Sequence, residues 1–165
     1  MITTAVRGVV VTALTTTLAL LPTLAQAEGK DKDNDIERVE LTGVSRLVKS
    51  PPRIREGGSW TTHLELYKTE KTKTNEERTR HVGDGESDCS AVKVERRYVT
   101  AQCTRTLRLK EGTLTLSDMI TSRPGERVTA KTAIIGGTGH YRSAYGDGYI
   151  TLDGRHVHLE LNVDE

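Results

Sequence analysis

Apolar and polar residues alternate with a period of two along most of the chain, and helical periodicity is hard to find. This alternation is typical of β-strands that have one buried face. Eight segments show it: residues 40–48, 60–67, 91–94, 98–109, 113–121, 128–135, 149–152 and 156–163. Eight short strands at regular spacing predict an all-β domain, folded as an antiparallel barrel or sandwich.

Clusters of Gly, Pro and Asp separate the predicted strands and predict turns, because these residues accommodate the backbone angles that turns need. The predicted turns are Pro51-Pro52, Gly57-Gly58, Gly83-Asp84-Gly85, Glu111-Gly112, Pro124-Gly125, Gly146-Asp147-Gly148 and Asp153-Gly154. The polar stretch 71–80 is ambiguous between a frayed strand and a long loop.

The N-terminal segment has a different pattern. Residues 8–24 are mainly apolar or Thr, Arg7 is the first charge, and Ala25-Gln26-Ala27 fits the small-x-small site at which signal peptides are cleaved. We interpret residues 1–27 as a secretory signal peptide, cleaved after Ala27. The protein is therefore expected to be secreted and extracellular.

A retained membrane anchor is the alternative interpretation of this segment. Pro22 interrupts the apolar run, which is short for a span of about 20 apolar residues. We therefore expect no stable membrane insertion. The charged segment 28–37 predicts a flexible tail, and residues 38–165 form the folded domain.

The charge balance of the chain indicates which classes of binding partner to expect. The chain has 24 Lys and Arg against 23 Asp and Glu, and a nucleic-acid-binding protein would normally show a basic surplus. We expect no nucleic-acid partner. The chain has no Phe, one Trp and five Tyr, so its interior must come mainly from Val, Leu, Ile and Ala.

Cys89 and Cys103 are the two cysteines. In an exported protein an even pair predicts a disulfide, with a free reactive thiol as the alternative. Two thiols are too few for a structural zinc site. Pairing Cys89 with Cys103 places Ala91 opposite Ala101 and predicts a turn at residues 95–97, and directly opposed Cβ atoms lie within reach of a disulfide.

Two further turns extend the predicted register. A two-residue turn at Glu111-Gly112 sets Leu107 opposite Leu116. A two-residue turn at Pro124-Gly125 then sets Leu116 opposite Ala133. The predicted inward face is Val99, Ala101, Cys103, Leu107, Leu109, Leu114, Leu116, Ile120, Ala133 and Ile135. The predicted outward face is Thr100, Thr104, Thr106, Arg108, Thr113, Thr115, Ser117 and Thr121.

The same register places three charged residues on the inward face. Arg105 falls opposite Asp118, and Asp118 falls opposite Lys131. One interpretation is a buried ion network that fixes the strand register. The other is a catalytic group, in which the cations stabilise negative charge on a substrate oxygen and Asp118 orients them or moves a proton. In a carrier, the same residues would bind an anionic head group.

Residues 134–146 (IIGGTGHYRSAYG) contain a glycine motif. A dinucleotide-binding fingerprint is excluded, because Arg142 stands where G-x-G-x-x-G needs its last glycine and too little chain follows. The motif resembles the GGTGxYxxAxG signature of the allene oxide cyclase barrel and dirigent-like superfamily. The cysteine pair and the hairpin LRLKEGTLTL also occur in the order seen in bacterial members. The resemblance covers residues 85–152.

This resemblance implies a single antiparallel eight-stranded β-barrel with an apolar cavity, in a homotrimer. It also implies that the protein steers cyclisation, isomerisation or coupling of a hydrophobic small molecule, without a cofactor. A non-catalytic secreted barrel that binds a ligand or a partner is the alternative, because fold does not imply function. The expected ligand-binding residues are Trp60, Leu107, Leu116, Ile120, Tyr141 and Tyr145.

Two aspects of these expectations stay open. Trp60 is core or cavity wall, and the tyrosines either rim a cavity mouth or pack over glycine backbone. His156 and His158 share one face of the last strand and could chelate Zn²⁺, but a solvated polar face is the simpler interpretation. We therefore expect no metal site.

Overall fold

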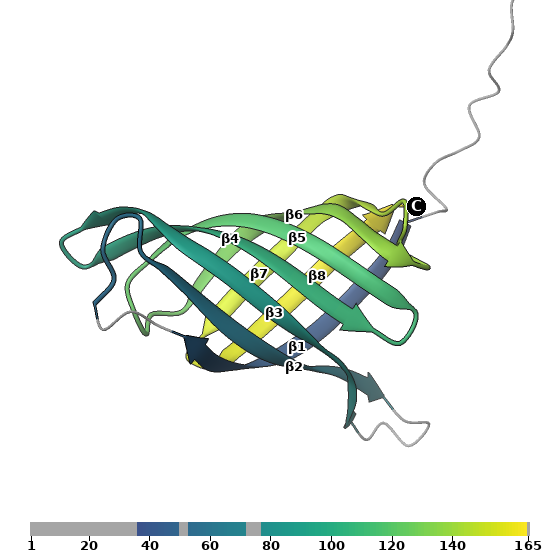
Figure 1. Ribbon diagram of the computed structural model, residues 1–165. Helices are drawn as coiled ribbons and strands as arrows, with labels where there is room; N and C mark the ends of the chain where they lie inside the picture. Colours follow the sequence, from purple (N-terminus) through teal and green to yellow (C-terminus); the bar gives the residue numbers. More distant parts are fainter. Residues whose placement is uncertain (1–35, 50–52, 72–76, 165) are drawn as a thin grey trace, which may run out of the picture. The chain divides into compact units, whose positions relative to one another are not determined.

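The computed structural model describes residues 36–49, 53–71 and 77–164. The strands are β1 (Ile36–Lys49), β2 (Ser59–Lys71), β3 (Glu77–Glu95), β4 (Tyr98–Leu109), β5 (Gly112–Ser122), β6 (Val128–Gly139), β7 (Tyr145–Asp153) and β8 (His156–Asp164). Each strand pairs antiparallel with the next, and β8 pairs with β1, so the sheet closes into a barrel (Figure 1). The predicted all-β, eight-stranded antiparallel barrel is confirmed.

The boundary between the predicted tail and the folded domain differs slightly from the predicted one. β1 begins at Ile36, so it includes the last two residues of the segment expected to be a flexible tail. The signal peptide predicted at 1–27 and the rest of the tail lie outside the described residues. In the part that the structure describes, no helix is long and apolar enough to cross a membrane.

The barrel interior is aliphatic, as the absence of Phe requires. Alternation along β8 buries Val157, Leu159, Leu161 and Val163 and exposes the residues between them. The fully buried aliphatic side chains are Leu64, Leu66, Leu107, Leu114, Leu116, Ile150, Leu159, Leu161 and Val163. Burying each such side chain contributes about 1.5–3 kcal/mol, so this core is the main source of stability.

Two glycine clusters predicted as turns lie inside strands instead. β3 has 19 residues and continues through Gly83-Asp84-Gly85, and β7 includes Gly146-Asp147-Gly148. Gly85 is paired with Leu107, and a Cβ atom there would lie 3.3 Å from Leu107 Cδ2. A Cβ atom on any of these four glycines would lie 2.0–2.6 Å from a backbone carbonyl oxygen of the neighbouring strand. The glycines therefore permit a close approach of adjacent strands, and a sequence pattern cannot distinguish that role from a turn.

The predicted register between β3 and β4 is confirmed around the disulfide. Cys89 pairs with Cys103, and Ala91 with Ala101. The turn is shorter than predicted, because Glu95 pairs with Tyr98 and a register shift between Ala91 and Lys93 takes up one residue. Such bulges increase strand twist and help a sheet to close.

The predicted register between β4 and β5 is wrong by two residues. Leu107 pairs with Leu114, and Leu109 with Gly112, so Gly112 belongs to the strand. A Cβ atom on Gly112 would collide with the Thr138 carbonyl oxygen, which explains the glycine without a turn. A slip of two keeps every side chain on its predicted face.

The predicted register between β5 and β6 is wrong by one residue, and this changes the face. Leu116 pairs with Ile134 and Asp118 with Thr132, so Thr132 and Ile134 are buried. Ala133, Ile135 and Lys131 point outward and are exposed. The five-residue connection 123–127 replaces the predicted two-residue turn, and a one-residue change reverses every side chain.

The two ends of the barrel differ. At one end, which we call the Tyr141 end, β6 and β7 are joined by residues 140–144, and Tyr141 and Ala144 are buried against the leucine core. Gly137 admits this loop, because a Cβ atom there would collide with backbone oxygens of Thr113 and Tyr141. The opposite end, which we call the pocket end, carries the β3–β4 turn at the left of Figure 1.

Candidate functional site

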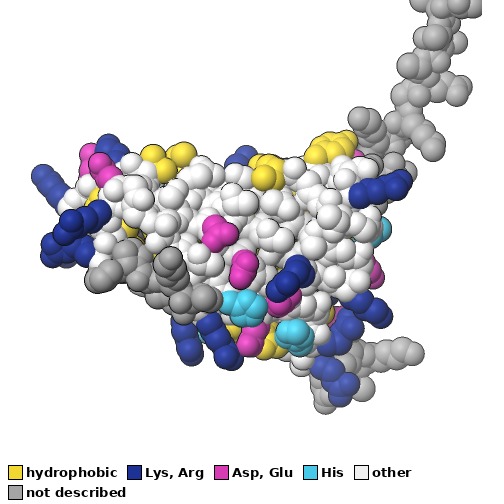
Figure 2. All heavy atoms as spheres, viewed as in Figure 1, with side chains coloured by type: hydrophobic (Ala, Val, Ile, Leu, Met, Phe, Trp, Pro, Cys, Tyr) yellow, Lys and Arg dark blue, Asp and Glu magenta, His cyan; other side chains and the backbone are white. Residues whose placement is uncertain are grey.

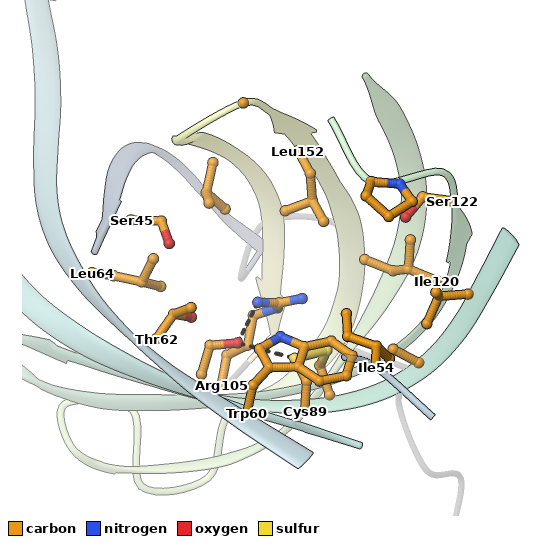
Figure 3. Close-up of a pocket in the computed structure, with 17 residues that line it drawn as sticks. Ser45, Ile54, Trp60, Thr62, Leu64, Cys89, Arg105, Ile120, Ser122 and Leu152 are labelled. Atoms are coloured by element: carbon orange, nitrogen blue, oxygen red, sulfur yellow. Dashed lines mark hydrogen bonds between the residues drawn. A yellow bond between two sulfur atoms is a disulfide. The ribbon is translucent and has the colours of Figure 1, made fainter. Parts of the chain in front are cut away.

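A pocket of about 240 Å³ lies inside the barrel at the pocket end (Figure 3). Its wall is mainly apolar and comprises Ile54, Trp60, Leu64, Val99, Ala101, Ile120, Pro124, Leu152 and Val157. Its polar lining residues are Ser45, Thr62, Ser87, Ser122 and Arg105. Alternation along the strands places these side chains inward, and the connections contribute Ile54 and Pro124.

The disulfide predicted from the cysteine pair is confirmed and forms part of this wall. Cys89 on β3 and Cys103 on β4 are joined with an S–S distance of 2.03 Å. Together with Ala101 they form a small buried cluster, against which Trp60 and Val99 pack. The disulfide thus links the two strands that carry most of the pocket's small side chains.

A buried ion pair forms the floor of the pocket. Arg105 Nε donates to Asp118 Oδ2 at 2.7 Å, and Arg105 Nη2 donates to Asp118 Oδ1 at 3.0 Å. The side chains of Arg105 and Asp118 are 4% and 0% exposed. Because two charges are removed from water here, the pair is tolerated only with its hydrogen bonds complete.

Ser87 completes the arrangement. Arg105 Nη1 donates to Ser87 Oγ, which lies 3.5 Å from Cys89 Sγ. These bonds use three of the five N–H groups that a guanidinium carries, and the remaining two have no acceptor among the described residues. Arg105, unlike Asp118, lines the pocket, so a ligand oxygen at the floor can accept from it.

Comparison with known proteins gives structural neighbours only. No protein-family model matches the sequence, and no curated protein is significantly similar to it. Among solved structures, a pyocyanin demethylase superposes with a TM-score of 0.57 at 18% identity, covering 77% of this chain and 99% of that chain. A pterocarpan synthase dirigent protein gives a TM-score of 0.45 at 17% identity, covering 78% and 83%.

The chain has the barrel fold of pyocyanin demethylase. That likeness holds over nearly the whole length of the other chain. At 18% identity it concerns the fold alone. The chemistry of the site therefore has to be argued from the residues that line it.

The predicted ligand-binding residues are divided among four places. Trp60 and Ile120 line the pocket. Leu107 and Leu116 are fully buried in the leucine core and do not line it. Tyr141 is buried at the opposite end of the barrel, where it packs on glycine backbone.

Tyr145 lies on the outside of the barrel, with 48% of its surface exposed. Its pKa is raised, because its hydroxyl is hydrogen-bonded to the Asp164 carboxylate, with smaller contributions from partial burial and from the negative charge of that carboxylate. Tyr145 is thus tied to the end of β8 and does not line the pocket.

The predicted trio of charged residues is only partly correct. Arg105 and Asp118 lie together inside the barrel. Lys131 does not join them: it is exposed on the outer wall and pairs with Tyr149 across β6 and β7. The prediction for Lys131 is wrong because the β5–β6 register differs by one residue.

Sequence reasoning missed Ser87, the hydroxyl that completes the floor. Ser87 stands two positions before Cys89, so alternation places both on the inward face. The signal was hidden because Gly83-Asp84-Gly85 was interpreted as a turn. Ser45, Thr62 and Ile54 were missed for a different reason, since isolated polar or apolar residues near strand ends carry no pattern.

The histidines of β8 lie away from the pocket. His156 and His158 are exposed on the outer wall, with ring centroids 6.5 Å apart. Among the described residues, no group of three or more His, Cys, Asp or Glu side chains is placed to hold a metal ion.

Proposed function

We propose that this protein binds a small hydrophobic molecule in the pocket at the pocket end. The observation that carries the proposal is an apolar wall that ends on a buried guanidinium with unused N–H groups. Ligand pockets typically combine such a wall with a few polar groups that orient the ligand.

The volume limits the size of the ligand. A cavity of ~150 Å³ holds a benzene-sized molecule, and pockets for drug-sized ligands measure about 300–1,000 Å³. At about 240 Å³, this pocket accepts a group of one or two rings. An oxygen on the leading ring would accept a hydrogen bond from Arg105.

The glycine motif and the barrel fold together support membership of the allene oxide cyclase barrel and dirigent-like superfamily. The motif at 136–146 spans the end of β6, the loop at 140–144 and the first two residues of β7, where its glycines admit the Tyr141 loop. Pyocyanin demethylase, which is named for a small molecule, has the same kind of barrel. Both support a small-molecule ligand for this chain.

Calorimetric titration with 2-acetylnaphthalene, a neutral two-ring ketone, tests the proposal. We expect saturable one-to-one binding, which Ala101→Leu abolishes because it fills the pocket. Ala133→Leu is the matched control, since Ala133 is exposed on the outer wall. Both variants need a thermal unfolding transition like the wild type's. Absence of binding to the wild-type protein, or equal binding by both variants, would contradict the proposal.

Arg105 supports a second candidate function, a cyclase- or isomerase-like activity. Its unused N–H groups would stabilise negative charge that develops on a substrate oxygen, and Asp118 would hold the guanidinium in place. An extract of the organism that encodes the protein supplies candidate substrates. A new chromatographic peak of unchanged mass, formed by wild type and absent with Asp118→Asn at a temperature where circular dichroism shows that this variant is still folded, supports catalysis. An unchanged extract would contradict this activity, and ligand binding would remain as the proposed function.

We also propose that the protein is exported after cleavage at Ala27. The disulfide supports this, because such bonds form and persist in oxidising compartments. Intact-mass measurement of the protein collected outside the cell decides the point. A mass that includes residues 1–27 would exclude the cleavage.

A homotrimer is the final part of the proposal. Three large apolar side chains on neighbouring strands β5, β6 and β7 are exposed: Met119 (57%), Ile135 (58%) and Tyr149 (48%). Large apolar side chains exposed on the outer face of three adjacent strands are consistent with an interface. Sedimentation equilibrium should give three times the mass of the chain, and a monomer at all concentrations would exclude the trimer.

A further inference from the structure

We propose that the ligand is a hydrophobic anion, with its rings in the pocket and its anionic group held by arginines beside the mouth. This inference rests on the proposed function and names the class of ligand. The four arginines are Arg53, Arg96, Arg97 and Arg123, which line a surface hollow at the pocket end. We call them the rim arginines.

The hollow and the pocket adjoin each other. Ile54, Val99 and Pro124 line both. A molecule that inserts its rings between these side chains therefore places a substituent directly in the hollow. The pocket would bind the apolar part of the ligand, and the adjoining hollow would bind its charged part.

The charge of the hollow is uniform. Its lining has four arginines and neither Asp nor Glu. In Figure 2, Lys and Arg side chains lie at this end of the barrel with Asp and Glu beside them, and further Lys and Arg lie at the other end. A concave surface lined by charges of one sign concentrates the field and attracts the opposite ion. The hollow at the Tyr141 end is mixed instead, because Glu37 and Glu111 accompany its basic residues.

Nearby carboxylates do not neutralise the rim arginines. Glu95 is paired with Lys93 at 2.8 Å, and a carboxylate oxygen of Glu56 accepts a bond from the Val94 backbone N–H. Arg123 has one ion pair with a described residue, a long contact of 3.8 Å to Glu126 Oε2. Its Nη2 also donates to the Tyr98 hydroxyl at 2.6 Å, and its guanidinium lies 4.6 Å from the centre of the Tyr98 ring. Arg53, Arg96 and Arg97 form no ion pair with any described residue.

The backbone at Arg96 gives an independent indication. Arg96 has φ 51°, and it is the one non-glycine residue in the described part of the chain with positive φ. Two-residue hairpin turns favour Asn or Gly at such positions, and a left-handed conformation costs other residues about 1–2 kcal/mol. An arginine in this strained position, at the edge of the hollow, is typical of a functional role.

Arg105 at the floor cannot replace the rim as the anion site. Its charge is already compensated by the bidentate contact with Asp118. A second carboxylate there would be buried beside Asp118, and like charges in a buried site repel strongly. The floor therefore suits an oxygen that is neutral in the bound ligand, even where it gains partial negative charge during a reaction, and the rim suits the permanent anion. A carboxylate, which arginine binds with two parallel hydrogen bonds, fits the rim best.

The test compares 2-naphthoate with 2-acetylnaphthalene, since the two molecules have nearly the same shape and differ in charge. At low salt we expect calorimetry to show naphthoate binding about tenfold more tightly, a difference of ~1.4 kcal/mol. The ratio should fall towards one at ~1 M salt, where screening acts over about 3 Å.

The double variant Arg96→Gln/Arg97→Gln should reduce the affinity ratio at low salt to nearly one. Arg78→Gln/Arg142→Gln is the matched control, because it removes two exposed arginines near the Tyr141 end and should retain the tenfold ratio. Equal affinities in the wild-type protein, or an unchanged ratio in the rim variant, would overturn the anion site while leaving the ligand pocket intact. No binding of either probe would overturn both proposals.

Discussion

Arg105 and Asp118 form their ion pair diagonally across two strands. In the β4–β5 ladder Arg105 is opposite Leu116, and Asp118 is opposite Cys103, yet the guanidinium reaches both carboxylate oxygens. Diagonal positions on one face are about 7–8 Å apart, within reach of a long side chain. The pair therefore links the disulfide-bearing level of the barrel to the leucine core.

Asp118→Asn should destabilise the protein strongly, because it leaves the Arg105 charge buried without its counter-ion. Loss of one partner from a buried pair costs ~3–5 kcal/mol, which urea unfolding monitored by circular dichroism will measure. Asp84→Asn is the matched control. Asp84 also binds an arginine, Arg108, but on the exposed outer wall, where pairs contribute about 1 kcal/mol or less. Equal effects of the two substitutions would contradict burial of the inner pair.

Replacing both cysteines with alanine should lower the free energy of unfolding by about 3 kcal/mol, the value that the chain-entropy model gives for a loop of roughly 15 residues. Cys89 and Cys103 are 14 positions apart. Urea unfolding of wild type, with and without reductant, and of the double variant will measure this. The unreduced, unfolded wild type should show no titratable thiol, and two thiols would disprove the bond.

Gly137→Ala should destabilise the Tyr141 end. The added methyl group would overlap backbone oxygens of Thr113 and Tyr141, and overpacking of this kind costs ~1–3 kcal/mol. Gly154→Asn serves as the control, because Gly154 has φ 59° with open space around it and Asn tolerates that conformation. Thermal unfolding should separate the two variants, and a neutral Gly137→Ala would show that the loop does not pack as described.

Tyr145 should ionise above the ordinary tyrosine pKa of about 10, because its hydroxyl is held by Asp164. The folded state then binds this proton more tightly than the unfolded state. Its contribution to stability is complete below pH ~10 and is lost as the pH rises through the raised pKa. Tyrosinate absorbance should show this transition moving to lower pH in Asp164→Asn. An unchanged titration curve would show that the hydrogen bond is absent in solution.

The fold could be predicted because the eight alternating segments and the cysteine pair each carry a strong local signal. The register between neighbouring strands could be predicted for only part of the sheet. The β3–β4 register was correct because the disulfide fixes it, whereas the β5–β6 register depended on the length of one connection, 123–127. A one-residue difference there moved Lys131 from the predicted interior to the outer wall.

The site was predicted less completely than the fold. Trp60, Ile120 and the pair of Arg105 with Asp118 were found because alternation assigns them to the inward face. Tyr141 was misplaced because strand direction puts the glycine motif at the end opposite the pocket. The rim arginines come from separate turns and connections, and scattered charges in a sequence carry no signal of their proximity.

The leucine core fills the barrel beyond Arg105, and this imposes an order of events on binding. In the proposed binding mode, a molecule that passes Ile54 and Pro124, which line both the pocket and the hollow, would advance as far as the guanidinium and stop. The molecule would have to leave by the same path. In that mode the rings would enter first and the anionic group would dock last, so dissociation would start by breaking the contact with the rim. Removing a rim arginine should therefore shorten the residence time of a bound anion more than it slows the anion's arrival.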